Sequence, residues 1–166
     1  ISGVVTVLVV LLAGMAAFAM VRYRFRGRRI LDSLIIASLM FPVFSTIIPV
    51  FQMLSAINVT DSPVGVILPQ IAGNLSFAMV ILMGYIRSLP VDLEESAFLE
   101  GCNVFQVFYK VILPVCRPAF ATVAIFSFLW SYNDLFTQLF FLRSPEKWTI
   151  TRFLNEVSSQ FGTDYG

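Results

Sequence analysis

Few side chains in this sequence could carry chemistry, and Asp134 is the most unusual of them. It lies inside the apolar block 118–142, and a carboxylate at the centre of a bilayer costs about 2.5–3.5 kcal/mol. Asn133 and Gln138 are its polar neighbours on the same block, and Asn74 lies in an earlier one. If these blocks cross a membrane, the four side chains either line a polar translocation path or make structural contacts with another helix or a companion chain.

Catalytic motifs are absent from the sequence. There is no G-x-x-x-x-G-K-[ST] loop for a nucleotide, no G-x-S-x-G elbow and no H-E-x-x-H pair. The chain has no histidine and only 2 cysteines, so a zinc site has very little support. We therefore expect no catalytic residue, metal or cofactor in this chain. Any ATP hydrolysis is expected on a separate subunit.

The stretch 93–114 is the longest amphipathic, charge-bearing segment between apolar blocks. Asp92 and Glu95 have the spacing of a capping box, which predicts the start of a helix. Gly101 suits the left-handed position that ends a helix. The pattern therefore predicts a short helix, a glycine and then a second short helix.

The second of these helices has an apolar face. Asn103 and Gln106 repeat the capping spacing, and Pro114 is expected to stop the helix. Apolar residues recur at spacings of one, three and four: Val104, Phe105, Phe108, Tyr109 and Ile112. Such a face fits a groove on a partner protein or lies on a bilayer. Charges for pairing with bases at the rim of a groove come from Glu94, Glu95 and Glu100.

Composition indicates a polytopic membrane protein. Of 166 residues, 58% are hydrophobic and 13% are charged, with a mean hydropathy of +0.85, which is more apolar surface than a soluble domain of this size could bury. A net charge of +1 argues against a nucleic-acid partner. We predict an all-α transmembrane bundle with spans at 3–21, 33–54, 64–86 and 118–142. Pro42 and Pro49 are expected to kink the second span.

Basic residues predict the orientation of the spans. Loops 22–29 and 87–117 lie on one side of a four-span chain and hold most of its 11 Lys and Arg residues, which places both in the cytoplasm. The tail 143–166 is then extracytoplasmic, and its pattern predicts an amphipathic surface helix. The arginines of loop 22–29 anchor the loop, or contact anionic lipid or a cytoplasmic subunit. The chain opens with Ile1 in an apolar run, and we expect it to be part of a longer protein.

One fixed spacing resembles the EAA loop of ABC importer permeases. That pattern is E-A-A, three residues, G, nine residues and I-x-L-P, and it is matched in spacing throughout and in residue type by Glu95, Ala97, Gly101, Leu113 and Pro114. Ser96 and Val111 replace alanine and isoleucine of the pattern but keep their size and character. Residues 16–19, 24–27 and 130–135 are similar to the maltose-type branch of that family, which imports sugars.

The resemblance implies a permease subunit of an ATP-driven importer for a sugar or oligosaccharide, with four of six spans in this sequence. It implies ATPase subunits that bind ATP and Mg²⁺, a second permease, an extracytoplasmic solute-binding protein and the lipid of a bacterial cytoplasmic membrane as partners. The residues that would couple the ATPase to the spans are Glu94, Glu95, Ser96, Ala97, Gly101, Phe105, Phe108, Leu113 and Pro114. Three alternatives stay open: an ABC permease for amino acids or phosphate, an ion-coupled secondary transporter that uses Asp134, and a membrane scaffold.

Overall fold

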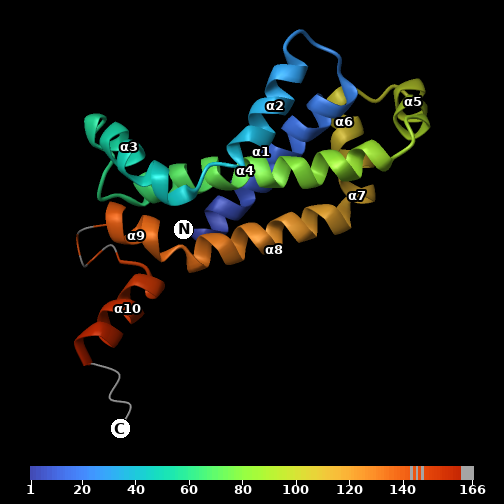
Figure 1. Ribbon diagram of the computed structural model, residues 1–166. Helices are drawn as coiled ribbons and strands as arrows, with labels where there is room; N and C mark the ends of the chain where they lie inside the picture. Colours follow the sequence, from blue (N-terminus) through green and yellow to red (C-terminus); the bar gives the residue numbers. More distant parts are fainter. Residues whose placement is uncertain (143, 145, 147, 162–166) are drawn as a thin grey trace.

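Three long helices lie alongside one another in the computed structural model and form the body of the molecule (Figure 1). They are α1 (Ser2–Arg22), α4 (Pro63–Ser88) and α8 (Arg117–Asn133). The structure describes residues 1–142, 144, 146 and 148–161, and every regular element within them is a helix. The predicted all-α fold is therefore confirmed.

The core follows one stripe on each long helix, because buried residues recur at every fourth position and so share a face. The stripes are Val5, Val9, Ala13 and Ala17 in α1, Gln70, Asn74, Ala78, Leu82 and Ile86 in α4, and Ala119, Val123, Ser127 and Ser131 in α8. Two of the stripes change from apolar to polar along their length. Since α4 and α8 run in opposite directions (Figure 1), their polar residues meet at the same end of the body.

Two of the long helices coincide with predicted spans. α1 covers 3–21 and α4 covers 64–86, and each is long and apolar enough to cross a membrane. A third candidate is the helix pair Val104–Val115 and Arg117–Asn133, which is bent by 82°. α4 begins after Ser62, whose hydroxyl oxygen accepts a hydrogen bond from the Gly65 N–H at 3.2 Å, as expected of a helix cap.

Residues 33–54 do not form the single kinked span that the sequence predicts. α2 (Arg28–Ser38) ends in a turn, and α3 (Val43–Ala56) begins after Pro42. Proline lacks an N–H and disfavours the helical conformation of the residue before it, so the helix breaks here. α2 has 11 residues and α3 has 14, whereas one straight span needs about 20.

Residues 118–142, which are predicted as one span, are also divided into two helices. α8 ends at Asn133, α9 (Leu135–Phe141) follows, and Asp134 between them has a non-helical ψ of 78°. The Asp134 Oδ1 atom accepts a hydrogen bond from the Thr137 N–H at 3.1 Å. A short acidic side chain that caps α9 stabilises the break.

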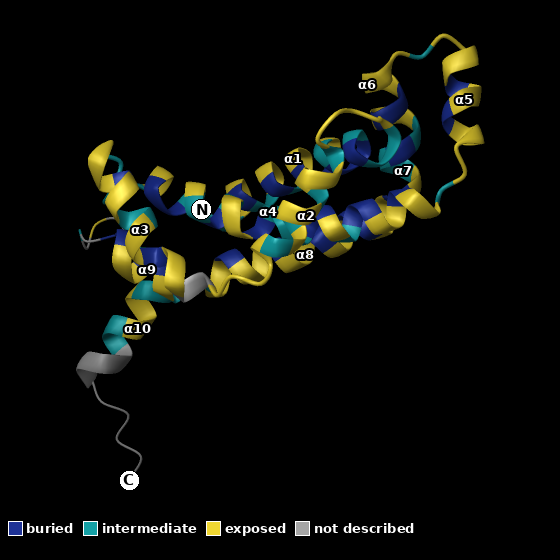
Figure 2. Ribbon diagram, turned by 45° about the horizontal axis from the view of Figure 1, so that its top comes forward, coloured by how far each residue is buried: buried dark blue, intermediate teal, exposed yellow. Residues whose placement is uncertain are grey.

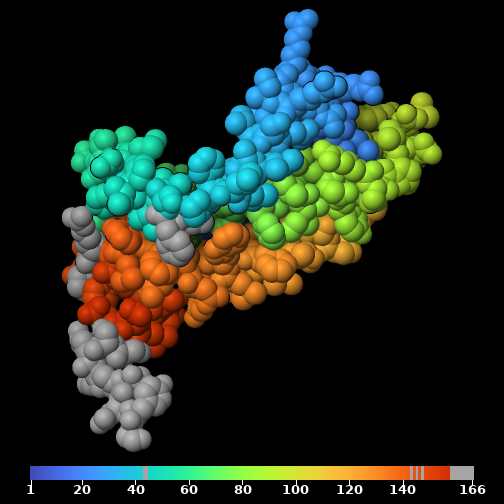
Figure 3. Space-filling model, in the orientation of Figure 1, coloured from blue at the N-terminus to red at the C-terminus, as the bar shows by residue number. Residues whose placement is uncertain are grey.

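Shorter helices occupy the two opposite ends of the body (Figures 1 and 3). At one end are α5 (Asp92–Leu99), α6 (Val104–Val107), the π-helix η1 (Phe108–Ile112) and α7 (Leu113–Val115). At the other end α3, α9 and α10 (Ile150–Phe161) lie together. Within the tail 143–166, residues 143, 145, 147 and 162–166 lie outside the described part of the chain.

Candidate functional site

Segment 87–117 has the predicted order of helix, glycine and helix. α5 ends at Leu99, and Gly101 follows with φ of +85°, a left-handed conformation that favours glycine. α6, η1 and α7 then follow one another without a gap. Gly101 thus sets the angle between two short rigid pieces at one end of the bundle.

One of the two predicted caps is present in this segment. The Asn103 Oδ1 atom accepts from the Gln106 N–H at 2.9 Å, and the Gln106 Oε1 atom accepts from the Asn103 N–H at 2.8 Å. The predicted cap at Asp92 is wrong, because α5 begins after Val91 and no side chain caps it. Asp92 is already helical, and its carbonyl oxygen accepts from the Ser96 hydroxyl at 2.8 Å.

Pro114 does not stop the second helix, contrary to prediction. It follows the π-helical turn of η1 and lies within α7, and the chain bends by 82° only after Val115. A π turn is wider than an α turn, which gives room for a residue that lacks an N–H and crowds the preceding turn. Phe108–Ile112 and Pro114 therefore join the short helices to α8 through a bend instead of a break at the proline.

The predicted coupling residues divide into an exposed and a buried set (Figure 2). Glu95, Ser96, Gly101 and Phe105 are exposed, Leu113 and Pro114 are half-buried, and Glu94, Ala97 and Phe108 are buried. The most exposed apolar side chains of the segment are Leu99 at 90%, Phe105 at 76% and Tyr109 at 71%. These three side chains give this end of the bundle an exposed apolar surface, which we call the Leu99–Tyr109 surface.

Phe108 packs inside this chain, so the predicted role of this side chain in a partner's groove is not supported by its position. Its ring centroid lies 5.6 Å from that of Phe18 on α1 and 6.3 Å from that of Phe120 on α8. Aromatic pairs at such separations pack favourably. Ile112, one turn further, is also fully buried. The apolar face of the second helix therefore divides between the core and the surface.

Glu94 is likewise turned inward, and the expectation that it offers a charge to a partner is wrong. The Arg22 Nε atom donates to Glu94 Oε1 at 2.5 Å, and both side chains are largely buried. Cys116, in the bend before α8, lies close enough to Arg22 and Glu94 for both charges to affect the pKa of its thiol. Burial is the largest effect and raises the pKa of the Cys116 thiol. The positive charge of Arg22 lowers this pKa by a smaller amount, and the negative charge of Glu94 raises it.

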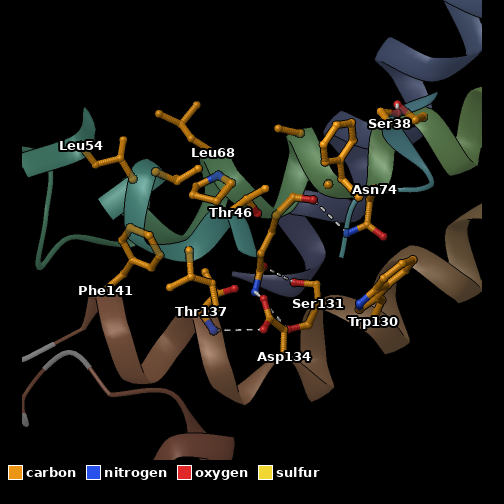
Figure 4. Close-up of a pocket in the computed structure, with 18 of the residues that line it drawn as sticks. Ser38, Thr46, Leu54, Leu68, Asn74, Trp130, Ser131, Asp134, Thr137 and Phe141 are labelled. Carbon is orange, nitrogen blue, oxygen red and sulfur yellow. Dashed lines mark hydrogen bonds between the residues drawn. The ribbon is translucent and has the colours of Figure 1, made fainter. Parts of the chain in front are cut away.

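A cavity of about 570 Å³ lies at the opposite end of the bundle (Figure 4). It is bounded by the turn after α2, by α3 and α4, and by the region where α8 meets α9. Its polar lining residues are Ser38, Thr46, Gln70, Asn74, Ser76, Ser131, Asp134 and Thr137. Trp130 lies at the edge of the cavity beside Asn74 in Figure 4. The cavity is thus an apolar pocket with polar groups gathered on its α4 and α8 sides.

A hydrogen-bond network joins α4 to the break between α8 and α9. The Ser131 hydroxyl donates to Gln70 Oε1 at 2.6 Å, and Gln70 Nε2 donates to Asp134 Oδ2 at 3.0 Å. Asp134 also caps α9 through Thr137. Asp134 is half-buried, and both of its carboxylate oxygens have partners within this chain.

Of the four predicted path residues, Asn74 and Asp134 line the cavity, and Asn133 and Gln138 do not. Asn133 is exposed and donates to the Leu129 carbonyl at 2.8 Å. Gln138 is buried and its side chain accepts from the Thr149 hydroxyl. Asn74 donates to the Gln70 carbonyl at 2.9 Å, while its buried Oδ1 atom has no hydrogen-bond partner among the residues that the structure describes. Asn74 Oδ1 is therefore an acceptor on the cavity lining that this part of the chain leaves unused.

Sequence reasoning missed Gln70 and Ser131 as members of this site. A signal was present: Gln70 and Asn74 continue the four-residue spacing of Ala78 and Leu82 along α4, and Ser131 continues that of α8. Polar residues that extend an apolar stripe lie in the interior of a bundle. Among the described residues, no cluster of three or more His, Cys, Asp or Glu could hold a metal ion.

The sequence matches a known family over almost its whole length. The pattern described as "Binding-protein-dependent transport system inner membrane component" covers residues 9–165. The chain belongs to this family. The match confirms the resemblance carried by the EAA-like spacing, and the named relatives of this inner membrane component are transporter permeases.

Named relatives of this inner membrane component include permeases for sugars. It is 36% identical over 162 residues to the diacetylchitobiose uptake system permease protein NgcG of Streptomyces coelicolor, covering 96% of this chain and 54% of that protein. It is 38% identical over 136 residues to the trehalose transport system permease protein SugB of Mycobacterium tuberculosis, covering 82% of this chain and 50% of that protein. The chain spans about half the length of the curated relatives it matches.

The fold of this inner membrane component also has a solved counterpart. A chain in the crystal structure of a bacterial ABC transporter involved in the import of the acidic polysaccharide alginate superposes with a TM-score of 0.80. The superposition covers 99% of this chain and 60% of that one, at 23% sequence identity. The likeness supports the overall fold described above.

Proposed function

We propose that the full-length protein is a permease subunit of an ATP-driven ABC importer for a sugar or oligosaccharide. The observation that carries the proposal is the Leu99–Tyr109 surface, where three large apolar side chains stand exposed on α5, α6 and η1. Phe108 of η1, in the same short helices, is buried against α1 and α8. A surface that is apolar outside and firmly packed inside is suited to receive a partner and to pass on its movement.

The partner at this surface is an ATPase subunit, which binds ATP and Mg²⁺ and supplies the energy. The exposed acids Glu95 and Glu100 lie next to the Leu99–Tyr109 surface and supply charges for its rim. Glu94 is not part of that rim, because it is paired with Arg22. A second permease subunit and an extracytoplasmic solute-binding protein complete the transporter, as the name of the family supports.

The cavity is the part of the translocation path that this chain supplies. Asn74, Gln70 and Asp134 present an amide oxygen, an amide and a carboxylate beside the indole of Trp130. Sugars need both hydrogen-bond partners and an apolar face, and this combination offers them. The cavity and the Leu99–Tyr109 surface lie at opposite ends of the bundle. Movement at one end can therefore open or close the other by rigid displacement of the long helices.

The protein lies as a multi-pass subunit in the cytoplasmic membrane of a bacterium. The length and apolar composition of α1 and α4 support the spans. The basic loops 22–29 and 87–117 support a cytoplasmic position for the Leu99–Tyr109 surface. The cavity then faces the extracytoplasmic half of the bilayer, where a binding protein delivers its solute.

Reconstitution of the transporter tests the proposal. The full-length subunit is purified by an affinity tag in mild detergent, its co-encoded partners are identified, and the complex is placed in proteoliposomes. Uptake of labelled diacetylchitobiose, trehalose, glutamine and phosphate is then measured with and without ATP. We expect ATP-dependent uptake of a saccharide. Uptake of glutamine or phosphate alone would select the non-sugar ABC alternative, and uptake that needs an ion gradient but no ATP would select the secondary transporter.

A further inference from the structure

Arg22 and Glu94 lie far apart in the sequence and meet at the base of α5. Arg22 is the last residue of α1, and Glu94 lies in the first turn of α5. The Arg22 Nε atom donates to Glu94 Oε1 at 2.5 Å, and Arg22 Nη2 donates to the Leu89 carbonyl oxygen at 3.2 Å. One guanidinium therefore connects the end of α1, the turn after α4 and the start of α5.

The burial of this pair distinguishes Arg22 from the neighbouring arginines. Only 12% of the Arg22 side chain and 5% of the Glu94 side chain are exposed. Arg24, Arg26 and Arg29 are exposed and make no ion pair within the described part of the chain. A positive-inside anchor needs only exposed charge, so anchoring does not explain why Arg22 is directed into the protein.

A buried ion pair contributes little net stability but fixes geometry. Removing two charges from water is unfavourable, and their attraction roughly offsets this only when the contacts are well made. The guanidinium is planar, and its donors have fixed directions, so two contacts from one Arg22 side chain restrict the orientation of what it holds. Here the group held is α5, which carries Leu99 of the Leu99–Tyr109 surface.

Arg22 belongs to α1, which runs through the whole bundle. The buried stripe of α1 packs along α4 and α8. A displacement of α5 that is carried by Arg22 therefore reaches the helices that line the cavity. The covalent connection from α4 to α5 is the turn between Leu89 and Val91, and a turn can absorb movement.

We propose that the Arg22–Glu94 pair is a positioning element that transmits the movement of α5 to α1, and so couples the ATPase to opening and closing of the cavity. The inference rests on the proposed function, since it needs an ATPase to move α5. It assigns to Arg22 and Glu94 a role within the chain, distinct from contact with the partner.

The informative variant is the neutral pair Arg22→Met with Glu94→Gln. Single substitutions leave one buried charge unpaired and reduce stability for that reason alone. The double substitution leaves no charge behind and keeps the approximate volume, so the complex should still fold and assemble. The matched control is Arg24→Met with Asp92→Asn, which removes two exposed charges from the same two stretches.

The measurement follows the cavity directly and needs no transported solute. Ser38, which lines the cavity, is changed to Cys in a Cys102→Ser background, and a membrane-impermeant maleimide reports its accessibility with and without ATP and Mg²⁺. The same background without Ser38→Cys gives the residual labelling of buried Cys116. Retention of the ATPase subunit and the rate of ATP hydrolysis are measured on the same complexes.

We expect the neutral pair to retain the ATPase and to hydrolyse ATP, while the ATP-dependent change in Ser38→Cys labelling falls at least about fivefold. The control should keep the full change. The inference is overturned if the neutral pair keeps the full change, or if it loses the ATPase together with the change, because the pair would then act only in assembly. If the unaltered complex neither retains an ATPase nor responds to ATP, the proposed function itself fails.

Discussion

Gly14 on α1 faces the ring of Phe120 on α8 so closely that a Cβ atom on Gly14 would lie 2.6 Å from Phe120 Cε1. The ring cannot move away freely, because Phe120 is buried and packs against Phe108 of η1. The same Cβ atom would lie 3.3 Å from Phe108 Cζ. Gly14 therefore permits the contact between α1, α8 and the segment that carries the Leu99–Tyr109 surface.

Gly14→Ala should lower the stability of the folded protein. An added methyl group in a packed core costs about 1–3 kcal/mol, which exceeds the gain of about 0.5–1 kcal/mol from replacing a helical glycine by alanine. Gly84→Ala is the control, since a Cβ atom there meets nothing within 4 Å. The apparent Tm of the full-length protein in detergent should fall for Gly14→Ala and stay level or rise for Gly84→Ala. Equal Tm values would contradict the close packing of Gly14.

Asp134→Asn should retain ATP-dependent uptake. The Asn side chain keeps an oxygen that accepts from the Thr137 N–H, so α9 keeps its cap. Asp134→Ala loses the cap, which costs about 1 kcal/mol, whereas both variants remove the carboxylate that accepts from Gln70 Nε2. Uptake and apparent Tm in proteoliposomes and detergent distinguish the two variants. Loss of uptake in Asp134→Asn at unchanged Tm would instead support an ion site at Asp134.

Much of this fold could be predicted from local sequence patterns. The left-handed Gly101, the capping box of Asn103 and Gln106, and the helices α1 and α4 follow from interactions between residues that are close in the chain. Pro42 predicts a disturbance of the helix but does not distinguish a kink from a break, because both depend on the same missing N–H. Which of them occurs is decided by the packing of the helices on either side.

The parts that sequence could not supply depend on contacts between distant elements. Phe105 and Phe108 look alike in the sequence, and only the positions of Phe18 and Phe120 show that one of them is in the core. Glu94 and Glu95 are adjacent acids, and only the position of Arg22 at the base of α5 shows that Glu94 is buried in an ion pair while Glu95 is exposed. Spacing predicts a shared helix face, but it does not reveal what covers that face.

Phe105→Ala should therefore affect binding of the ATPase, and Phe108→Ala should affect stability. Phe105→Ala removes exposed area from the Leu99–Tyr109 surface, so retention of the ATPase in a detergent pull-down should fall several-fold at unchanged Tm. Phe108→Ala leaves a cavity between α1 and α8 and should lower stability by about 3–5 kcal/mol. Unchanged ATPase retention in Phe105→Ala would count against docking at this surface.

The two native cysteines offer a test of which side of the membrane holds segment 87–117. Cys102 follows Gly101 and is partly exposed, whereas Cys116 is fully buried. The thiolate is the form that reacts with a maleimide, and burial raises the pKa of the Cys116 thiol, so both access and ionisation disfavour labelling there. An impermeant maleimide should label Cys102 in inside-out vesicles and not in intact cells.

Cys102→Ser is the matched control for this labelling. In inside-out vesicles it should remove the part of the signal that is due to Cys102, because Cys116 does not react while the protein is folded. Denaturation in detergent should then expose Cys116 and add one labelled thiol. Bound ATPase should slow labelling of Cys102, since this residue lies between α5 and α6. Labelling of Cys102 from outside intact cells would place the segment beyond the reach of a cytoplasmic ATPase, and the proposed coupling would be wrong.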